Sequence, residues 1–342
     1  MSVVRAAGYV RDLPSEAPIA NLSIDRQRQR IAAHADAMGW EIVRVYDDSG
    51  AEARRQGLPA QEQLLSELEG LDKVIVVRLD RFARSSRRVL DVIERVKDAR
   101  VGLVALREEI DTGTPEGVAA ARVLDSVSKW GPEGPAGHGL HWDPAQLALR
   151  DFTPVTVIDV GANEGVPSLV EIFPDAHHVL IEPLHEYEPA LRQLLADARS
   201  GEYVCAAVGA QDGEVEINVE TTMALSSVLE VEAEAERPVT ERRTVPMRKL
   251  DSLLDEREWQ GPFGLKIDVE GFEDKVIAGA ESLLASTQFV VAEVSVTPRF
   301  EGAPLCGEFI GLMRLHGFVV ADVIDAHSSP FRIYADLLFE RS

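Results

Sequence analysis

Three acidic residues, Asp268, Glu270 and Glu293, have the types and positions that could activate an alcohol. Each lies at or just beyond the end of an apolar segment that predicts a buried strand. Side chains alternate along a strand, so Lys266, Asp268 and Glu270 are expected on one side of the sheet. A carboxylate at such a point can take the proton of a hydroxyl group as a general base. We therefore predict Asp268, Glu270 and Glu293 as catalytic residues.

Other roles remain open for these acids. Glu270 and Glu273 could equally cap the following helix, whose N-terminal end favours carboxylates. Asp268, Glu270 and Glu293 could also hold Mg²⁺ through oxygen ligands, although we favour a site without a metal ion. His185 and His327 are expected in loops at the same edge, where a histidine could serve as the base. A solvated or structural role is commoner for such residues, and we keep only His327 as a catalytic candidate.

A glycine-bearing turn follows an apolar strand in the stretch VIDVGANEG at 157–165. Glycine tolerates positive φ and lets the backbone approach a ligand closely. In open α/β sheets, ligands bind at the carboxyl ends of the strands, and this turn ends the first strand of its domain. The spacing differs from the GxGxxG of dinucleotide binders, and its acids suit a cation such as S-adenosylmethionine better than a pyrophosphate. We predict cofactor contacts from Asp159, Gly161, Asn163 and Gly165.

Two further acids are placed to bind the same ligand. The next strand ends at Glu182, 17 residues past Gly165, where a carboxylate can accept hydrogen bonds from both hydroxyls of a ribose. The strand after it leads into the turn GAQDG at 209–213, where Asp212 could meet an adenine amine. We predict Glu182 and Asp212 as cofactor-binding residues and S-adenosylmethionine as the cofactor.

Five segments of the second half form a specific set. They are VIDVGANEG at 157–165, IEP at 181–183, AAVGAQDG at 206–213, LDSLL at 250–254 and KIDVEGFE at 266–273. This set resembles the FkbM family of methyltransferases over residues 155–295. The resemblance implies a class I methyltransferase fold, S-adenosylmethionine as the methyl donor, and O-methylation of a small molecule, a sugar or a natural product.

Both halves of the chain alternate predicted strands with predicted helices, which indicates parallel sheets with crossover helices. In the first half, strands are expected at 3–10, 41–46, 73–77 and 101–106, and helices at 24–38, 60–69, 86–98 and 115–130. In the second half, strands are expected at 155–160, 178–181, 203–208, 264–268, 289–294, 318–323 and 335–340, with an antiparallel pair at 214–219 and 243–250 and helices at 168–173, 188–198, 274–284 and 308–316. The predicted fold class is α/β, with two domains that each contain a mostly parallel sheet and flanking helices; the second is a Rossmann-like sheet of seven strands.

A segment rich in glycine and proline, GPEGPAGHGLHWDP at 131–144, separates the two halves. It can neither continue a helix nor form a central strand. We predict domains at 1–130 and 152–342, joined by a linker at 131–151.

The first half contains GYVR at 8–11, NLSIDRQR at 21–28, YDDSG at 46–50 and RLDRFARS at 78–85. Together these segments resemble the resolvase-like catalytic domain of serine recombinases over residues 3–130. The resemblance implies that Arg11, Arg81 and Arg84, with Asp80, would hold a phosphate. The serine nucleophile of that family falls at Leu13, which has no lone pair to attack phosphorus, so we expect recombination to be lost.

The first domain is therefore expected to be a binding or dimerisation module. The resemblance implies that the 115–130 helix pairs two copies of the chain. Its arginines could bind an anion, but we favour a solvated, salt-bridged face made of Arg78, Arg81, Arg84, Arg87 and Arg88.

The charge and the cysteine content limit the classes of partner and the cellular location that we expect. Residues 131–342 hold 15 Lys and Arg against 37 Asp and Glu, which accounts for most of the net charge of −23 and repels nucleic acid from that half. Two cysteines and the lack of a long apolar run favour a cytoplasmic protein that does not enter a membrane. We expect a small hydroxylated acceptor. One alternative is a nucleic-acid-binding protein whose first domain directs the methyltransferase to DNA or RNA, and another is a scaffold without activity.

Overall fold

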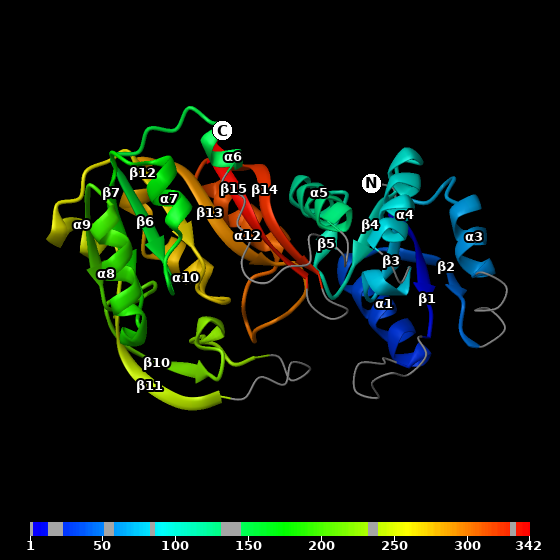
Figure 1. The fold of residues 1–342 in the computed structure, drawn as a ribbon. Coiled ribbons are helices and arrows are strands. Elements are labelled where there is room, and N and C mark those ends of the chain that lie inside the picture. Colours follow the sequence, from blue (N-terminus) through cyan, green and yellow to red (C-terminus); the bar gives the residue numbers. More distant parts are fainter. Residues whose placement is uncertain are drawn as a thin grey trace. The chain divides into compact units, whose positions relative to one another are not determined.

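The computed structural model describes residues 3–12, 23–50, 58–82, 86–130, 145–231, 239–328 and 333–342. The chain divides into two compact units, Met1–Gly134 and Pro135–Ser342 (Figure 1). Of the predicted linker 131–151, residues 131–144 lie outside the described residues, and Ala145–Ala148 form a short helix. Within the described part of the chain, no helix has both the length and the apolar character needed to cross a bilayer.

The first unit contains a five-stranded sheet in the order β2-β1-β3-β4-β5. The strands are β1 (Arg5–Val10), β2 (Glu41–Asp47), β3 (Lys73–Val76), β4 (Gly102–Ala105) and β5 (Ile110–Asp111). The first four are parallel, and β5, which the sequence did not indicate, is antiparallel to β4. Because the apolar strands alternate with amphipathic helices, the chain forms a parallel sheet with crossover helices.

The helices of the first unit begin where the sequence predicts. They are α1 (Ile24–Met38), α3 (Pro59–Ser66), α4 (Ser86–Asp98) and α5 (Pro115–Trp130), with a 3₁₀ turn at Leu79–Arg81. The hydroxyl of Ser23 accepts a hydrogen bond from the Arg26 amide at 3.3 Å, and that of Thr114 accepts one from the Gly117 amide at 3.0 Å. Both residues are therefore helix caps, because they satisfy amide groups that have no partner inside the helix.

The second unit is built on a seven-stranded sheet in the order β14-β15-β13-β12-β6-β7-β8. The strands are β6 (Thr156–Val160), β7 (His177–Ile181), β8 (Ser200–Val204), β12 (Phe263–Ile267), β13 (Thr287–Ser295), β14 (Phe318–Ser328) and β15 (Ile333–Arg341). Only β15 runs antiparallel to its neighbours. The prediction of two α/β units, the second with seven strands, is confirmed.

Helices surround this sheet and bury its apolar faces. They are α6 (Ala145–Ala148), α7 (Pro167–Ile172), α8 (Glu188–Asp197), α9 (Leu250–Arg257), α10 (Glu273–Ala278), α11 (Glu281–Ala285) and α12 (Cys306–Leu315). The single helix predicted at 274–284 is wrong, because α10 ends at Ala278 and α11 begins at Glu281. A Cβ at Gly279 would lie 2.2 Å from the carbonyl oxygen of Gly209, so the chain approaches another loop too closely for a side chain.

A second sheet of three strands, in the order β10-β11-β9, belongs to the same unit. Strands β10 (Gly213–Glu220) and β11 (Val239–Arg248) are antiparallel, and β9 (Ala207–Val208) pairs with β11. The strand predicted at 203–208 is therefore divided between the two sheets. Figure 1 shows β10 and β11 crossing the arrowhead ends of β6 and β7, which is the edge where a ligand is expected.

Candidate active site

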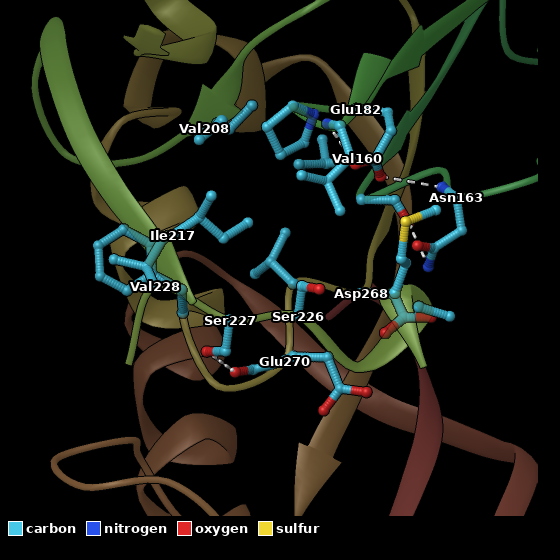
Figure 2. Close-up of a pocket in the computed structure, with 18 of the residues that line it drawn as sticks. Val160, Asn163, Glu182, Val208, Ile217, Ser226, Ser227, Val228, Asp268 and Glu270 are labelled. Atoms are coloured by element: carbon cyan, nitrogen blue, oxygen red, sulfur yellow. Dashed lines mark hydrogen bonds between the residues drawn. The ribbon is translucent and has the colours of Figure 1, made fainter. Parts of the chain in front are cut away.

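A cavity of about 520 Å³ opens at the carboxyl ends of β6, β7 and β12 (Figure 2). Its walls combine carboxylates, serines and apolar side chains, and no lysine, arginine or histidine is among the described residues that line it. The lining residues used below are Gly161, Asn163, Glu182, Ser227, Asp268 and Glu270.

The glycine turn forms one wall of the cavity. Gly161 has a φ of 72° and Asn163 a φ of 50°, so two residues of the turn are in the left-handed region. A Cβ at Gly161 would lie 1.9 Å from the carbonyl oxygen of Asp268, which shows why only glycine fits between these strand ends. Gly165 does not line the cavity; its open side is filled by Leu194, and it serves the packing of α8.

Glu182 connects the turn after β6 to the end of β7. Its side chain is buried, and its Oε2 and Oε1 accept hydrogen bonds from the amides of Asn163 at 3.0 Å and Leu184 at 2.8 Å. Burial raises the pKa of the carboxyl group to about 7, against the two amide hydrogen bonds, which lower it. Glu182 thus lines the cavity as predicted, at the position where a ribose could be bound.

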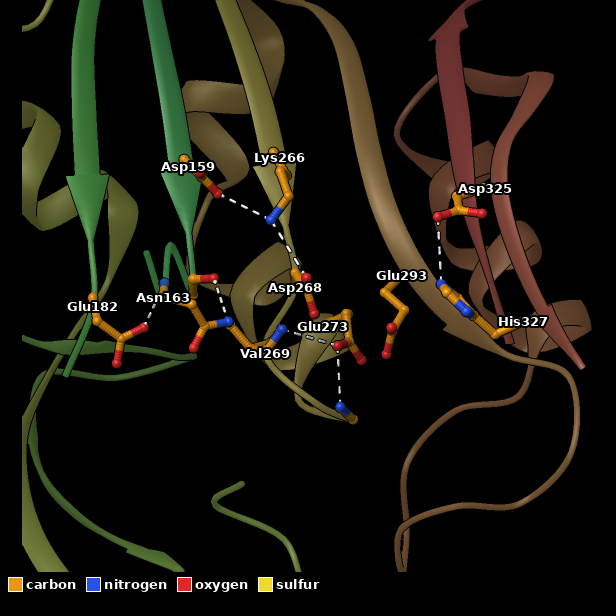
Figure 3. Close-up of polar contacts among 12 residues, drawn as sticks. Asp159, Asn163, Glu182, Lys266, Asp268, Val269, Glu273, Glu293, Asp325 and His327 are labelled. Carbon is orange, nitrogen blue, oxygen red and sulfur yellow. Dashed lines mark hydrogen bonds and ion pairs between the residues drawn. The ribbon is translucent and has the colours of Figure 1, made fainter. Parts of the chain in front are cut away.

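A buried lysine bridges the strands next to the cavity. The Nζ of Lys266 lies 3.1 Å from Oδ1 of Asp159 and 3.5 Å from Oδ2 of Asp268 (Figure 3). The register of the sheet produces the first contact, because Lys266 on β12 is paired with Asp159 on β6. Asp159 is 1% exposed and does not line the cavity, so it holds Lys266 in place and is not the direct cofactor contact that we predicted.

The three predicted catalytic carboxylates lie together. Oxygen atoms of Asp268, Glu270 and Glu293 are within 4.8 Å of one another, and Asp268 and Glu270 line the cavity, whereas Glu293 is buried behind them. Glu270 has a φ of 53°, an uncommon conformation for a residue other than glycine. The hydroxyl of Ser227 donates a hydrogen bond to the Glu270 carbonyl at 2.6 Å and fixes this turn.

The choice between capping and the cavity is resolved for two neighbouring acids. Glu273, in the first turn of α10, accepts hydrogen bonds from the amides of Val269 at 3.2 Å and Gly271 at 3.0 Å. Burial and the nearby Glu293 raise the pKa of Glu273 to about 8. Glu273 therefore closes the loop before the helix, which leaves Glu270 at the cavity wall.

Two predicted residues lie away from the cavity. The carboxylate of Asp212 accepts hydrogen bonds from the Lys249 amide at 2.9 Å and the Ser252 hydroxyl at 2.7 Å, and it pairs with Arg248. It holds the end of β11 to α9 and does not reach the ligand cavity. His327, on β14, lies 3.4 Å from Asp325 and stacks on the ring of Tyr334, with centroids 4.6 Å apart. The Asp325 carboxylate raises the pKa of His327.

Sequence reasoning missed one buried residue in this region. Arg299, in the segment that follows β13, pairs with both Glu270 and Glu293. Its segment, TPRF at 297–300, has no pattern that indicates a buried cation. Only the three-dimensional proximity of two loops reveals it.

Three arginines near strand ends of the first unit are buried. Arg11, Arg78 and Arg81 follow β1 and β3 and are 5%, 9% and 1% exposed, so the expected solvated face does not hold for Arg78 and Arg81. Outside the described part of the chain lie Leu13, Arg84 and the side chains of Asp80, Arg87 and Arg88.

Comparisons with known proteins agree with this division. Residues 6–133 match the family described as resolvase, N terminal domain, and residues 159–320 match the methyltransferase FkbM domain. The chain joins a resolvase N-terminal domain to an FkbM methyltransferase domain. S-adenosylmethionine is the methyl donor of the FkbM domain, and the carboxylate-rich cavity fits such a cation.

The resolvase domain has named relatives. It is 41% identical over 125 residues to the probable DNA-invertase y4cG of Sinorhizobium fredii, and 31% identical over 123 residues to the DNA-invertase of Escherichia phage P1. Each match covers 36% of this chain, and they cover 37% and 59% of the two relatives. The chain therefore spans less than two thirds of either protein.

Two solved structures are similar to parts of this chain. The N-terminal catalytic domain of TP901-1 integrase is 28% identical, with a TM-score of 0.33 over 38% of this chain and 97% of that one. Magnesium protoporphyrin IX methyltransferase from Synechocystis PCC 6803, with bound S-adenosylmethionine, is 13% identical, with a TM-score of 0.33 over 65% of this chain and 79% of that one.

Proposed function

We propose that this chain methylates a hydroxyl group of a small molecule, a sugar or a natural product, with S-adenosylmethionine as donor. The supporting observation is the charge of the cavity: Glu182, Asp268 and Glu270 line it, and no basic side chain does among the described residues. Such a wall suits a sulfonium cation and disfavours a pyrophosphate. The bound cofactor would supply an electrophilic methyl group.

The cofactor would be held by the turn after β6 and by Glu182. Gly161 lets the turn pack against the end of β12 at the cavity wall, and Asn163 offers an amide side chain at the cavity. Glu182 already accepts two backbone amides, and its remaining lone pairs would accept hydrogen bonds from ribose hydroxyls. Strand ends tied together in this way would place the ligand without further rearrangement.

Asp268 is the proposed base. Its side chain is 19% exposed at the cavity and is held by Lys266, whereas the carboxylate of Glu270 is engaged by Arg299. Asp268 would take the proton of the acceptor hydroxyl as the carbon–oxygen bond forms, and Lys266 would stabilise its charged form beforehand. The apolar residues Met223, Val228 and Phe272 would keep water away from the reacting methyl group.

Asp268→Asn tests this role with a panel of hydroxylated acceptors and radiolabelled S-adenosylmethionine. Removal of a general base should lower kcat by about a hundredfold or more, whereas the affinity for the cofactor should fall far less, through the loss of one of three carboxylates at the cavity. Asp274→Asn is the control, because Asp274 lies on α10, pairs with Lys275 and does not line the cavity. Equal kcat values for Asp268→Asn and wild type would exclude Asp268 as the base.

We also propose that the resolvase domain is a binding or dimerisation module and not a recombinase. Three buried arginines at its strand ends suit an anion such as a phosphate, and Leu13 stands where a nucleophilic serine would be required. Titration of a DNA duplex at several salt concentrations tests for nucleic acid, because phosphate contacts weaken steeply as salt rises. Salt-dependent binding would favour the alternative in which this domain brings nucleic acid to the methyltransferase.

A further inference from the structure

Arg299 is a buried cation that pairs with two acids beside the cavity. Its side chain is 2% exposed, and its partners Glu270 and Glu293 are 7% and 10% exposed. Its Nη1 lies 2.5 Å from Oε1 of Glu293, and its Nη2 pairs with Glu270. One guanidinium group therefore joins an acid that lines the cavity to an acid that does not.

The guanidinium group of Arg299 is held in place by aromatic rings and by the neighbouring backbone. It lies over the ring of Tyr334 at 4.0 Å and near the ring of Phe300 at 5.1 Å. The backbone that precedes Arg299 is anchored, because the amides of Val296 and Thr297 donate to the Ile333 carbonyl at 2.8 and 3.1 Å. The stacking and the backbone contacts together fix where the charge is placed.

The same segment is tied to the loop that covers the cavity. The Glu301 amide donates to the Glu230 carbonyl at 2.8 Å, and Phe300 forms a bridge with Val231. That loop also supplies Ser227, whose hydroxyl holds the Glu270 carbonyl. Glu270 is thus gripped at its backbone by Ser227 and at its carboxylate by Arg299.

The acids around Arg299 have the spacing of a cation site. Oxygen atoms of Asp268, Glu270 and Glu293 lie within 4.8 Å of one another, and oxygens from three carboxylates would be a suitable ligand set for Mg²⁺ or Mn²⁺. Two of the three carboxylates are already bound by the planar fork of one arginine, which matches carboxylate geometry. A metal ion would have to compete with a cation that is covalently part of the chain.

We propose that Arg299 is the built-in cation of this cluster: it positions Glu270 at the cavity wall and fills the place that a divalent ion would otherwise take. The positioning part rests on the proposed methyl transfer, whereas the occupation of the cation site does not. Removal of the guanidinium should therefore convert the cluster into a divalent-ion site.

Calorimetric titration of Mn²⁺ into the full chain without cofactor tests the occupation directly. Arg299→Ala should bind one Mn²⁺ at least tenfold more tightly than wild type, and Arg299→Ala combined with Glu293→Gln should lose this gain. If Arg299→Ala does not fold, Arg299→Gln carries the same expectation. Stoichiometric Mn²⁺ binding by wild type that depends on Glu293, or no gain in any folded Arg299 variant, would overturn the proposal.

Arg150→Ala is the matched control, because Arg150 also bridges two carboxylates of the same unit. It lies 2.8 Å from Glu340 and 3.7 Å from Asp322, but its side chain is 29% exposed. Water can solvate the acids that remain there, so no Mn²⁺ site should appear. A gain equal to that of Arg299→Ala would show that any unpaired acids suffice and would overturn the specific role of Arg299.

Methyl-transfer kinetics test the positioning role. Arg299→Ala should lower kcat by on the order of a hundredfold, as expected when a positioned acid–base site is lost, and guanidinium ions at millimolar concentration should restore part of it. Arg299→Lys should retain more activity than Arg299→Ala. Unchanged kcat would overturn the positioning role. Failure of every variant and of wild type to bind S-adenosylmethionine would instead refute the proposed function and leave the Mn²⁺ result standing.

Discussion

The two units of this chain differ in the charge of the buried residues that follow two interior strands of each sheet. In the resolvase domain, Arg11 follows β1 and Arg78 follows β3, and both are buried. In the FkbM domain, Glu182 follows β7 and Asp268 follows β12, at the edge of a cavity. The carboxyl ends of parallel strands are where α/β sheets bind ligands, so the sign of the charge there indicates the ligand. These charges support the proposal that the first unit binds an anion and the second a cation.

The largest expected effect is a loss of stability when a buried charge is removed from the FkbM domain. A half-buried ion pair in the other unit serves as the comparison. Lys266 and Asp159 are 6% and 1% exposed, whereas Lys73 and Asp111 are 15% and 28% exposed. Lys266→Met should lower the free energy of unfolding of its unit by about 3–5 kcal/mol, because it leaves the buried carboxylate of Asp159 without its cation. Lys73→Met should cost about 1 kcal/mol or less. Urea unfolding of both variants measures the difference, and equal costs would contradict the contrast in burial.

A smaller effect is expected from pH on cofactor binding. The pKa of Glu182 is about 7 in the folded protein, raised by burial from 4.5. A cationic ligand favours the ionised carboxylate, so binding must expel a proton below pH 7 and proceeds without that cost above it. The affinity for S-adenosylmethionine should therefore fall by about tenfold from pH 8 to pH 6.

Calorimetry at three pH values measures this trend, and Glu182→Gln should remove it. The same raised pKa means that ionisation of Glu182 costs the folded state stability as pH rises from 4.5 to 7. The unit without cofactor should accordingly gain stability toward pH 5. A cofactor affinity that rises toward acid pH would contradict the charge argument.

The sequence could reveal only part of this contrast. What it reveals depends on how far apart the interacting residues lie along the chain. Strands, helices and the residues at strand ends follow from local patterns, so Gly161, Asn163 and Glu182 could be predicted. Arg299 could not, because it meets Glu270 across 29 residues of chain. Asp212 was misplaced because its turn belongs to the three-stranded sheet, where Arg248 and Ser252 use its carboxylate.

The fold deviates from prediction for similar reasons. The strand expected at 203–208 is divided because β8 and β9 pair with different sheets, a choice made by tertiary contacts and not by the apolar pattern. Helix α9 has the sequence LDSLLDER at 250–257. No helix was predicted there, because this segment shows little amphipathic pattern. Local propensity leaves such cases undecided.

The smallest effect is expected from weakly bound anions. Sulfate should slow hydrogen exchange of backbone amides near Arg78 and Arg81 and leave those near Gly161 unchanged, whereas S-adenosylmethionine should do the reverse. An anion at about its dissociation constant stabilises its unit by only about 0.4 kcal/mol, so the protection will be slight. Exchange measured by mass spectrometry resolves the two units, and protection near Gly161 by sulfate would contradict the assignment of opposite charges.

Calorimetric titration of S-adenosylmethionine into wild type, Glu182→Ala and Asp212→Ala tests the central claim most directly. We predict one site in wild type, an affinity about 10- to 100-fold weaker in Glu182→Ala through lost hydrogen bonds to a charged acceptor, and no significant change in Asp212→Ala. Absence of binding in wild type, or weakening by Asp212→Ala alone, would contradict the assignment of the cavity at the ends of β6, β7 and β12 as the cofactor site.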